Sequence, residues 1–206
     1  MSKYNYDVAV VDTNALFPGG AFKFNGFRSS DNMPDLVGVV NEKAYLLNRD
    51  EAEVDPTRKQ PIPYCSVMDS SGKIYMYRRP GNGNEQRLAT KASIGVGGHV
   101  EKEDFVPTGN VVTETAIREI REELGIERSD IASIDVVGFI NDDRVEVDSV
   151  HFGIAIVVTL EPGVQVVPRK SEIVGGKFVS VSDAAIQTDL ENWSKIFIDH
   201  LFARSL

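Results

Sequence analysis

The most regular pattern of apolar and polar positions lies in residues 111–126. Small and apolar side chains recur there at helical spacing: Thr113, Ala116, Ile117, Ile120 and Leu124. Such a stripe predicts a helix that packs one face against a sheet. Glu119, Glu122 and Glu123 are related by three and four positions, so they project together from a different face. We therefore expect one side of this helix to be buried and the other to concentrate negative charge.

Shorter apolar runs predict strands before and after this helix. They cover residues 7–11, 36–40, 44–47, 62–68, 73–79, 92–96, 134–140, 145–160 and 176–181. The turn composition of residues 69–72 predicts a hairpin between two of these strands. Ser182 is a candidate helix cap, and a last helix over residues 191–203 is expected to bury Trp193 and Phe197 against the sheet. The pattern is typical of an α/β protein.

The distribution of these elements predicts two parts. Residues 1–60 hold a few short strand patterns between turn-rich segments at 17–26 and 29–34, too few for an independent core. We predict a β-rich N-terminal extension over residues 1–60, which packs on the main domain or across a homodimer interface. The main domain then covers residues 61–206, and the polar run at 48–60 is the predicted join.

Charge and cysteine content restrict the partners of the chain. Its 31 acidic residues outnumber 22 Lys and Arg, and the formal net charge of −9 disfavours nonspecific binding to nucleic acid or anionic membranes. The single cysteine, Cys65, excludes an internal disulfide and a multi-cysteine zinc site. The opening MSKYNYD lacks signal-peptide character, and the apolar run 154–160 is too short to span a bilayer. We expect a cytoplasmic protein with a small-molecule partner.

The three glutamates of the central helix indicate a metal site. Carboxylates at this spacing repel one another and destabilise a helix unless a cation neutralises them. Hard divalent cations prefer oxygen ligands, so Mg²⁺ is the expected metal, with Mn²⁺ as a substitute. The alternative is a solvated acidic face, which is common in acidic proteins.

The stretch from Gly97 to Ile126 resembles the signature of the Nudix hydrolases, a family of MutT-like phosphohydrolases. That signature reads Gly-x5-Glu-x7-Arg-Glu-U-x-Glu-Glu-x-Gly-U, where U is aliphatic. Residues 118–126, REIREELGI, match at every fixed position. The front half departs from the pattern, because Asn110 stands where Glu is expected and Asp104 ends the x5 gap. An insertion of about six residues at 105–110 accounts for both, and a longer loop before the helix is expected.

The resemblance implies an α/β/α sandwich with a mixed sheet between helices, and it implies site residues. The expected metal ligands are the Gly98 carbonyl and four carboxylates: Glu119, Glu122, Glu123 and Glu172. Glu172 precedes Phe178 by the interval at which several family members carry a further ligand or the catalytic base. Arg118 is expected to orient the acidic side chains by ion pairing. Glu101 and Asp104 are weaker metal-binding candidates.

The resemblance further implies that metal-activated water cleaves a diphosphate bond in a nucleoside diphosphate linked to another group X. Arg78, Arg79 and His99 are candidate substrate contacts, although strand-end arginines also serve as surface charge and a lone histidine is often structural. His151 and His200 are interpreted as packing residues.

Three other functions stay open. One is a nucleotide sensor on the same fold, which would be expected to have lost the acidic cluster. Another is an isopentenyl diphosphate isomerase, which needs a cysteine in a motif that Cys65 lacks. The third is a scaffold role for residues 1–60.

Overall fold

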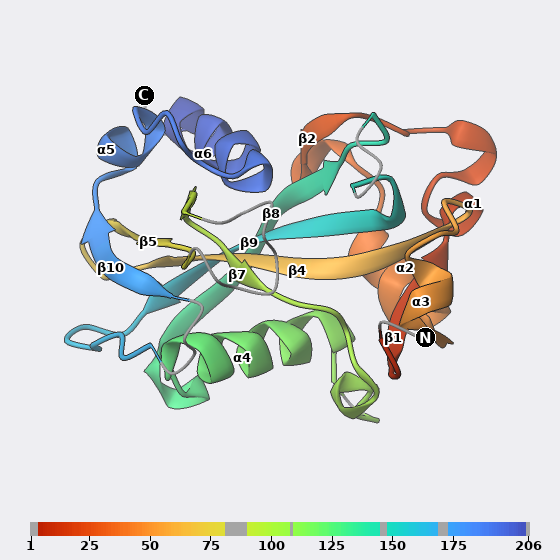
Figure 1. Cartoon of the computed structure of the whole chain (residues 1–206), viewed down its shortest axis with the longest axis horizontal. Helices are drawn as coiled ribbons and strands as arrows, with labels where there is room; N and C mark the ends of the chain where they lie inside the picture. Colours follow the sequence, from red (N-terminus) through yellow and green to blue (C-terminus); the bar gives the residue numbers. More distant parts are fainter. Residues whose placement is uncertain (1–3, 81–89, 108, 145–147, 169–172, 205–206) are drawn as a thin grey trace. The chain divides into compact units, whose positions relative to one another are not determined.

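The structure, a computed structural model, is of mixed α/β class and describes residues 4–80, 90–107, 109–144, 148–168 and 173–204 (Figure 1). Its strands are β1 Asp7–Asp12, β2 Gly26–Ser29, β3 Tyr45–Asn48, β4 Arg58–Met68, β5 Ile74–Arg78, β6 Ala92–Ser93, β7 Val96–Gly97, β8 Ile131–Asn141, β9 His151–Leu160 and β10 Val174–Val179. Its α-helices are α1 Thr13–Leu16, α2 Leu36–Lys43, α3 Arg49–Ala52, α4 Val111–Leu124, α5 Val181–Ala185 and α6 Asn192–Arg204. None of the described helices is long and apolar enough to cross a membrane.

The chain forms two compact units, each assembled from three separate segments. The first unit contains Met1–Tyr64, Gly98–Ala116 and Val136–Ala155. The second contains Cys65–Gly97, Ile117–Asp135 and Ile156–Leu206. The first sixty residues therefore share one unit with parts of the central and C-terminal sequence.

In the first unit, β1 is a buried strand with neighbours on both sides. It pairs antiparallel with β3, where Ala9 faces Leu46, and with β4, where Val11 faces Lys59. β2 pairs antiparallel with β8, which is itself the neighbour of β9. Val8, Val10 and Ala52 pack into a fully buried cluster. These contacts make the N-terminal strands part of the core of this unit.

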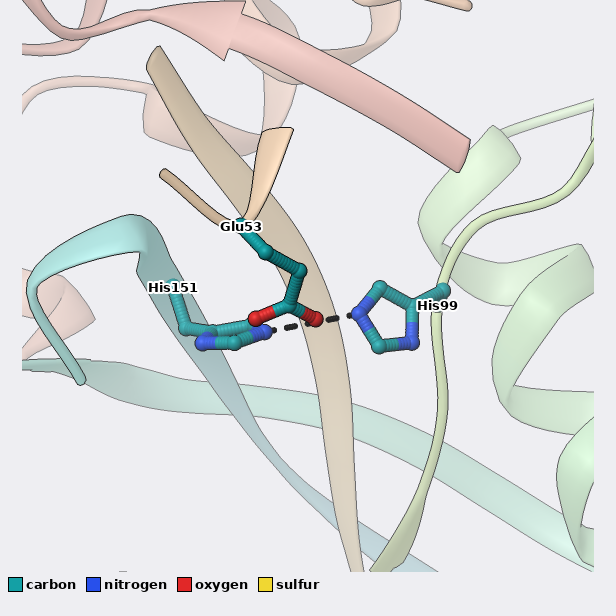
Figure 2. A group of neighbouring side chains, drawn as sticks. All are labelled: Glu53, His99 and His151. Carbon is teal, nitrogen blue, oxygen red and sulfur yellow. Dashed lines mark hydrogen bonds between the residues drawn. The ribbon is translucent and has the colours of Figure 1, made fainter. Parts of the chain in front are cut away.

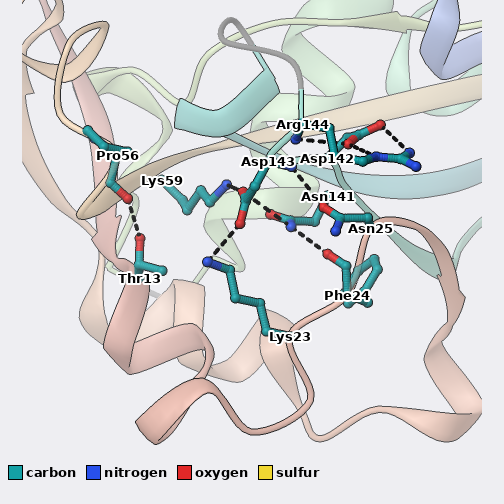
Figure 3. Close-up of polar contacts among 10 residues, drawn as sticks. All are labelled: Thr13, Lys23, Phe24, Asn25, Pro56, Lys59, Asn141, Asp142, Asp143 and Arg144. Atoms are coloured by element: carbon teal, nitrogen blue, oxygen red, sulfur yellow. Dashed lines mark hydrogen bonds and ion pairs between the residues drawn. The ribbon is translucent and has the colours of Figure 1, made fainter.

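A polar network holds the loop before β2 against the end of β8 (Figure 3). The Asp143 carboxylate accepts from Lys59 Nζ at 2.5 Å and pairs with Lys23 Nζ at 2.7 Å. Asn141 Nδ2 donates to the Phe24 carbonyl at 2.7 Å, and Asn25 Oδ1 accepts from the Asp143 amide at 2.9 Å. Burial lowers the pKa of the Lys59 ammonium, and the Asp143 carboxylate opposes that shift.

In the second unit, β5 lies between β10 and β4 and also pairs with β6. The predicted hairpin is confirmed, because Met68 of β4 faces Ile74 of β5. Asp69 fixes the turn by accepting from the amides of Ser71 at 2.8 Å and Lys73 at 3.0 Å. Gly72 has φ +82°, a backbone conformation that favours glycine. Helices α5 and α6 lie side by side (Figure 1).

One prediction for the N-terminal residues is wrong. Residues 36–40 were expected as a strand but begin helix α2, because Asp35 Oδ1 caps its first turn by accepting from Gly38 N at 2.8 Å. The polar run 48–60, the predicted join, contains α3 and the start of β4, where Lys59 and Gln60 are fully buried. Its role as a domain boundary stays a prediction.

Smaller differences concern element boundaries. β2 lies in a segment where only turns were expected, and β9 begins at His151 rather than near residue 145. The cap of α5 is Ser180, whose Oγ accepts from Asp183 N at 3.0 Å, and not Ser182. Other predicted elements are confirmed with shifts of a few residues, including α4, β8, β10 and α6.

Candidate active site

The predicted helix of residues 111–126 is confirmed as α4, with one apolar face and one acidic face. Ala116, Ile120 and Leu124 are fully buried, as a packed face requires. Glu119 and Glu123, one helical turn apart, are each only 6% exposed. Glu122 lies nearer the surface, with 40% of its side chain exposed. The acidic face is therefore a largely enclosed cluster rather than a fully solvated surface.

Arg118 is the cation of this cluster. Its Nη1 donates to Glu119 Oε1 at 2.6 Å and lies 3.8 Å from Glu122 Oε2. A hydrogen bond from a guanidinium fixes a carboxylate in place and favours its ionised form. Arg118 thus lies within contact of two of the glutamates, and its orienting role in the reaction stays a prediction.

Cys65 lies close enough to the cluster for its charges to act on the thiol. Burial raises the pKa of Cys65, and the carboxylates of Glu119 and Glu123 raise it further. The side chain is fully buried. A protonated, inaccessible thiol is a poor nucleophile, which argues against the isomerase alternative.

Asn110, which stands where the family pattern has Glu, is the cap of α4. Its Oδ1 accepts from the amides of Val112 at 3.0 Å and Thr113 at 3.2 Å. The amide of Val111 donates to Asn41 Oδ1 at 2.8 Å, from α2. Two side chains thus satisfy three of the amides that a helix start leaves unbonded. One of them comes from the first sixty residues.

The two weaker acidic candidates stabilise a turn ahead of α4. Residues Lys102–Asp104 form a 3-10 helix. Glu101, just before it, and Asp104, its last residue, form a capping box, in which the side chain of each accepts from the backbone amide of the other. Asp104 accepts from the Glu101 amide at 2.8 Å and is 3% exposed. This capping box gives both carboxylates a structural role, and metal binding by either one stays a prediction.

The two candidate arginines at the end of β5 have acidic partners. Arg79 Nε donates to Glu191 Oε2 at 2.9 Å, and Glu191 is 3% exposed and also accepts from Ser93 Oγ at 2.8 Å. Arg78 Nη1 pairs with Asp189 at 2.5 Å, where half of the arginine side chain is exposed. Both ion pairs link the end of β5 to residues that precede α6. Substrate contact by either arginine stays a prediction.

The remaining candidates are divided among different parts of the chain. Gly98 and His99 belong to the first unit, whereas the glutamates of α4 belong to the second. Glu172 falls outside the described residues. His99 lies beside His151 and Glu53 (Figure 2), a grouping that the sequence did not indicate. These residues are so far apart in the sequence that no motif spacing could reveal them.

The donor set of α4 fits a hard divalent cation. Three glutamates and Arg118 carry a formal net charge of two negative units, and enclosed carboxylates are costly unless they are neutralised. Oxygen ligands of this kind suit Mg²⁺ or Mn²⁺. Metal binding by these three glutamates stays a prediction, because in the structure the group of described residues whose ligand atoms lie within 4.8 Å of one another is a different one, Glu53, His99 and His151.

Comparison with known proteins agrees with this chemistry. The chain matches the NUDIX domain over residues 58–201. Protein YmaB of Bacillus subtilis is 35% identical over 206 residues, which cover 98% of this chain and all of that protein. The crystal structure of Tm1382, a candidate Nudix hydrolase, has a TM-score of 0.77 and 25% identity over 96% of this chain and 99% of its own.

A third similarity is to the NUDIX domain of Shewanella oneidensis NrtR, solved in complex with ADP-ribose. It has a TM-score of 0.51 and 13% identity over 72% of this chain and 89% of that chain, a likeness of fold alone. The family match covers more than half of the chain and contains the complete acidic face of α4. The chain therefore belongs to the Nudix family of hydrolases.

Proposed function

We propose that this hydrolase cleaves a diphosphate bond in a nucleoside diphosphate linked to a second group, with Mg²⁺ as its metal. The observation that carries the proposal is the cluster on α4, where Glu119 and Glu123 are enclosed and Glu122 reaches the surface. A solvated acidic face would leave all three exposed. Enclosed carboxylates instead need a cation, and a diphosphate is a ligand that such a cation attracts.

Glu119, Glu122 and Glu123 would hold the metal, joined by the Gly98 carbonyl and Glu172 as the sequence predicts. The bound metal supplies two kinds of chemistry: it lowers the pKa of a water molecule and neutralises charge on phosphate oxygens. Arg118 orients Glu119 through its hydrogen bond to Oε1. Glu119 or Glu172 accepts the proton of the attacking water, and the bond between phosphorus and the leaving phosphate oxygen breaks.

The proposed substrate class is supported by a similar fold and by the positively charged side chains near the end of β5. A NUDIX domain with the same fold binds ADP-ribose, a nucleoside diphosphate linked to a sugar. In this chain Arg78, Arg79 and His99 are the proposed contacts to the phosphates or the base. Because Arg78 is half exposed, it can exchange Asp189 for a phosphate more readily than Arg79 can leave Glu191.

We also propose a cytoplasmic location, because the only cysteine is free and buried and so does not depend on an oxidising compartment.

A homodimer that uses residues 1–60 is the proposed assembly. Size-exclusion chromatography with light scattering measures the assembly directly, and a monomeric mass would exclude it.

A release screen tests the proposed reaction. Purified protein is incubated with nucleoside triphosphates, ADP-ribose, dinucleotide cofactors, nucleotide sugars and dinucleoside polyphosphates, with Mg²⁺ or with a chelator. We expect Mg²⁺-dependent turnover of a class in which a nucleoside diphosphate carries a second group. Turnover that persists in the chelator would contradict the proposed metal dependence. Turnover of nucleoside triphosphates alone would contradict the proposed substrate class.

A further inference from the structure

Two histidines and one glutamate meet in the first unit, in a place that the Nudix signature does not describe (Figure 2). Glu53 follows α3, His99 follows β7, and His151 opens β9. One ligand atom from each residue lies within 4.8 Å of those of the other two. A nitrogen of each imidazole points toward the other ring, the two ring planes are inclined by 64°, and the carboxylate lies beside the line that joins the nitrogens.

The spacing of the imidazoles matches a metal centre. Their Nε2 atoms are 3.4 Å apart. Two nitrogens bound to one tetrahedral Zn²⁺ at about 2.1 Å are themselves about 3.4 Å apart. A hydrogen bond between the two rings also fits this distance. The carboxylate of Glu53 favours the metal, because it adds a third ligand atom at the same point.

Each of the three residues is held by a buried neighbour. Ala52, Val100 and Phe152, the residues next to Glu53, His99 and His151, are all fully buried. The carbonyl of Val100 also accepts from the Ala9 amide at 2.8 Å, which ties the segment of His99 to β1. Ligands on fixed backbone lose little conformational freedom on binding an ion, so the site is preorganised.

Arg49 fixes the carboxylate. Its Nε donates to Glu53 Oε1 at 3.1 Å, and its guanidinium also bonds the Tyr6 hydroxyl and stacks 4.0 Å from the centre of the Tyr4 ring. A metal-binding carboxylate is commonly oriented by such a hydrogen bond, and its two oxygens can serve a donor and a metal together. The guanidinium offsets much of the charge of Glu53, so selectivity comes mainly from the imidazoles.

We propose that Glu53, His99 and His151 bind a divalent transition metal ion, with Zn²⁺ as the first candidate. Imidazole ligands favour Zn²⁺ and its first-row neighbours over Mg²⁺. All three residues are half-buried, which gives an ion access, and three protein ligands leave a position for a water or ligand oxygen. Glu53 precedes the residues that match the NUDIX domain, so the site depends on the N-terminal segment.

Metal titration tests this site without any measurement of hydrolysis. Full-length protein without a histidine tag is stripped of metal and titrated with Zn²⁺ in excess Mg²⁺, by calorimetry. The absorption of bound Co²⁺ then reports the ligands directly. We expect one Zn²⁺ per chain that Mg²⁺ does not displace. In Glu53→Gln, His99→Gln and His151→Gln the affinity should fall at least about tenfold, with the Co²⁺ spectrum altered.

Two matched variants identify the source of binding. His200→Gln removes the remaining histidine of the chain, and Glu122→Gln changes the acidic face of α4; both should keep the Zn²⁺ affinity and the Co²⁺ spectrum. Circular dichroism of each metal-free variant checks that it is folded. If a histidine variant does not fold, the Zn²⁺ affinity of the isosteric Glu53→Gln variant decides the result. Absence of stoichiometric Zn²⁺ binding, or equal affinity in wild type and Glu53→Gln, would overturn the proposal and leave a hydrogen-bonded histidine pair.

Discussion

Two neighbouring arginines at the end of β5 show how burial changes the value of an ion pair. Glu191, the partner of Arg79, is 3% exposed, whereas Asp189, the partner of Arg78, is 45% exposed at its side chain. Removing one member of an enclosed pair leaves an uncompensated charge, but an exposed pair exchanges easily with water. The two positions therefore form a matched comparison within one strand.

We expect Arg79→Met to lower the free energy of unfolding by about 3 kcal/mol, because Glu191 loses its cation. Arg78→Met should lower it by less than about 1 kcal/mol, because its pair is exposed. Urea denaturation of both variants measures the difference. Equal losses would show that Arg79 and Glu191 do not form the buried pair described for the structure.

At the level of elements, α4 depends on a cap that replaces an expected glutamate. The Asn110 carboxamide accepts from two amides of the first turn. Asn41 of α2 accepts from a third, so the N-terminal segment stabilises the start of the helix that carries the glutamates.

Asn110→Ala should therefore reduce stability by about 1 kcal/mol, the usual contribution of a helix cap. Asn110→Asp keeps an oxygen acceptor at the same position and should be close to wild type. Thermal and urea denaturation distinguish the two variants. A loss of the same size in both would mean that the amide of Asn110, rather than its oxygen, supports the helix.

The Asp143 network joins three segments of the first unit and gives a pH-dependent contribution to stability. Burial opposes the charge on Asp143, but hydrogen bonds from Lys23 and Lys59 outweigh it and hold the pKa of the carboxyl below its ordinary value. A carboxyl with a depressed folded-state pKa contributes stability above its unfolded pKa of about 3.9 and loses it as pH falls through the folded value.

Asp143→Asn should lower the free energy of unfolding at pH 7 by about 3 kcal/mol, because the buried Lys59 ammonium would lose the carboxylate that it pairs with at 2.5 Å. The stability advantage of wild type over this variant should shrink below about pH 4. Urea denaturation from pH 7 to pH 3 follows the difference. A difference that stays constant across this range would contradict the ionised pair.

At the scale of the whole molecule, the sequence predicted local elements better than the contacts between distant segments. The match of residues 118–126 to a signature and the helical spacing of its glutamates are local properties, and α4 has both. Asn110 could not be recognised as a cap, because the family pattern drew attention to a missing glutamate. Residues 36–40 were predicted as a strand because they are rich in β-branched valine, although Asp35 before them is a residue typical of helix caps.

Groupings that depend on tertiary structure left no trace in the sequence. His99 and His151 are 52 residues apart and come together only through the pairing of the first unit. His151 alone reads as a packing residue, because a lone histidine has no spacing to test. The network of Lys23, Lys59 and Asp143 could not be predicted either, because it joins a loop, a strand and a turn that are far apart in the sequence.

The first 57 residues precede the NUDIX match, yet β1 pairs with both β3 and β4 and is buried. Deleting them would expose apolar core and leave Lys59 of β4 without its strand neighbour. We expect a fragment of residues 58–206 to be unfolded or aggregated, as seen by circular dichroism and size-exclusion chromatography. A folded, active fragment would instead make the N-terminal segment a separable extension.

The most direct test of the proposed reaction compares hydrolysis by wild type, Glu122→Gln and Glu114→Gln across the nucleotide panel in Mg²⁺. Glu114 lies on the same helix but outside residues 118–126, so its variant should keep the wild-type rate. We expect one substrate class to be turned over, and Glu122→Gln to lower that rate at least about a hundredfold. Equal rates for wild type and Glu122→Gln, or no turnover while a nucleotide raises the melting temperature, would contradict the role assigned to the acidic face of α4.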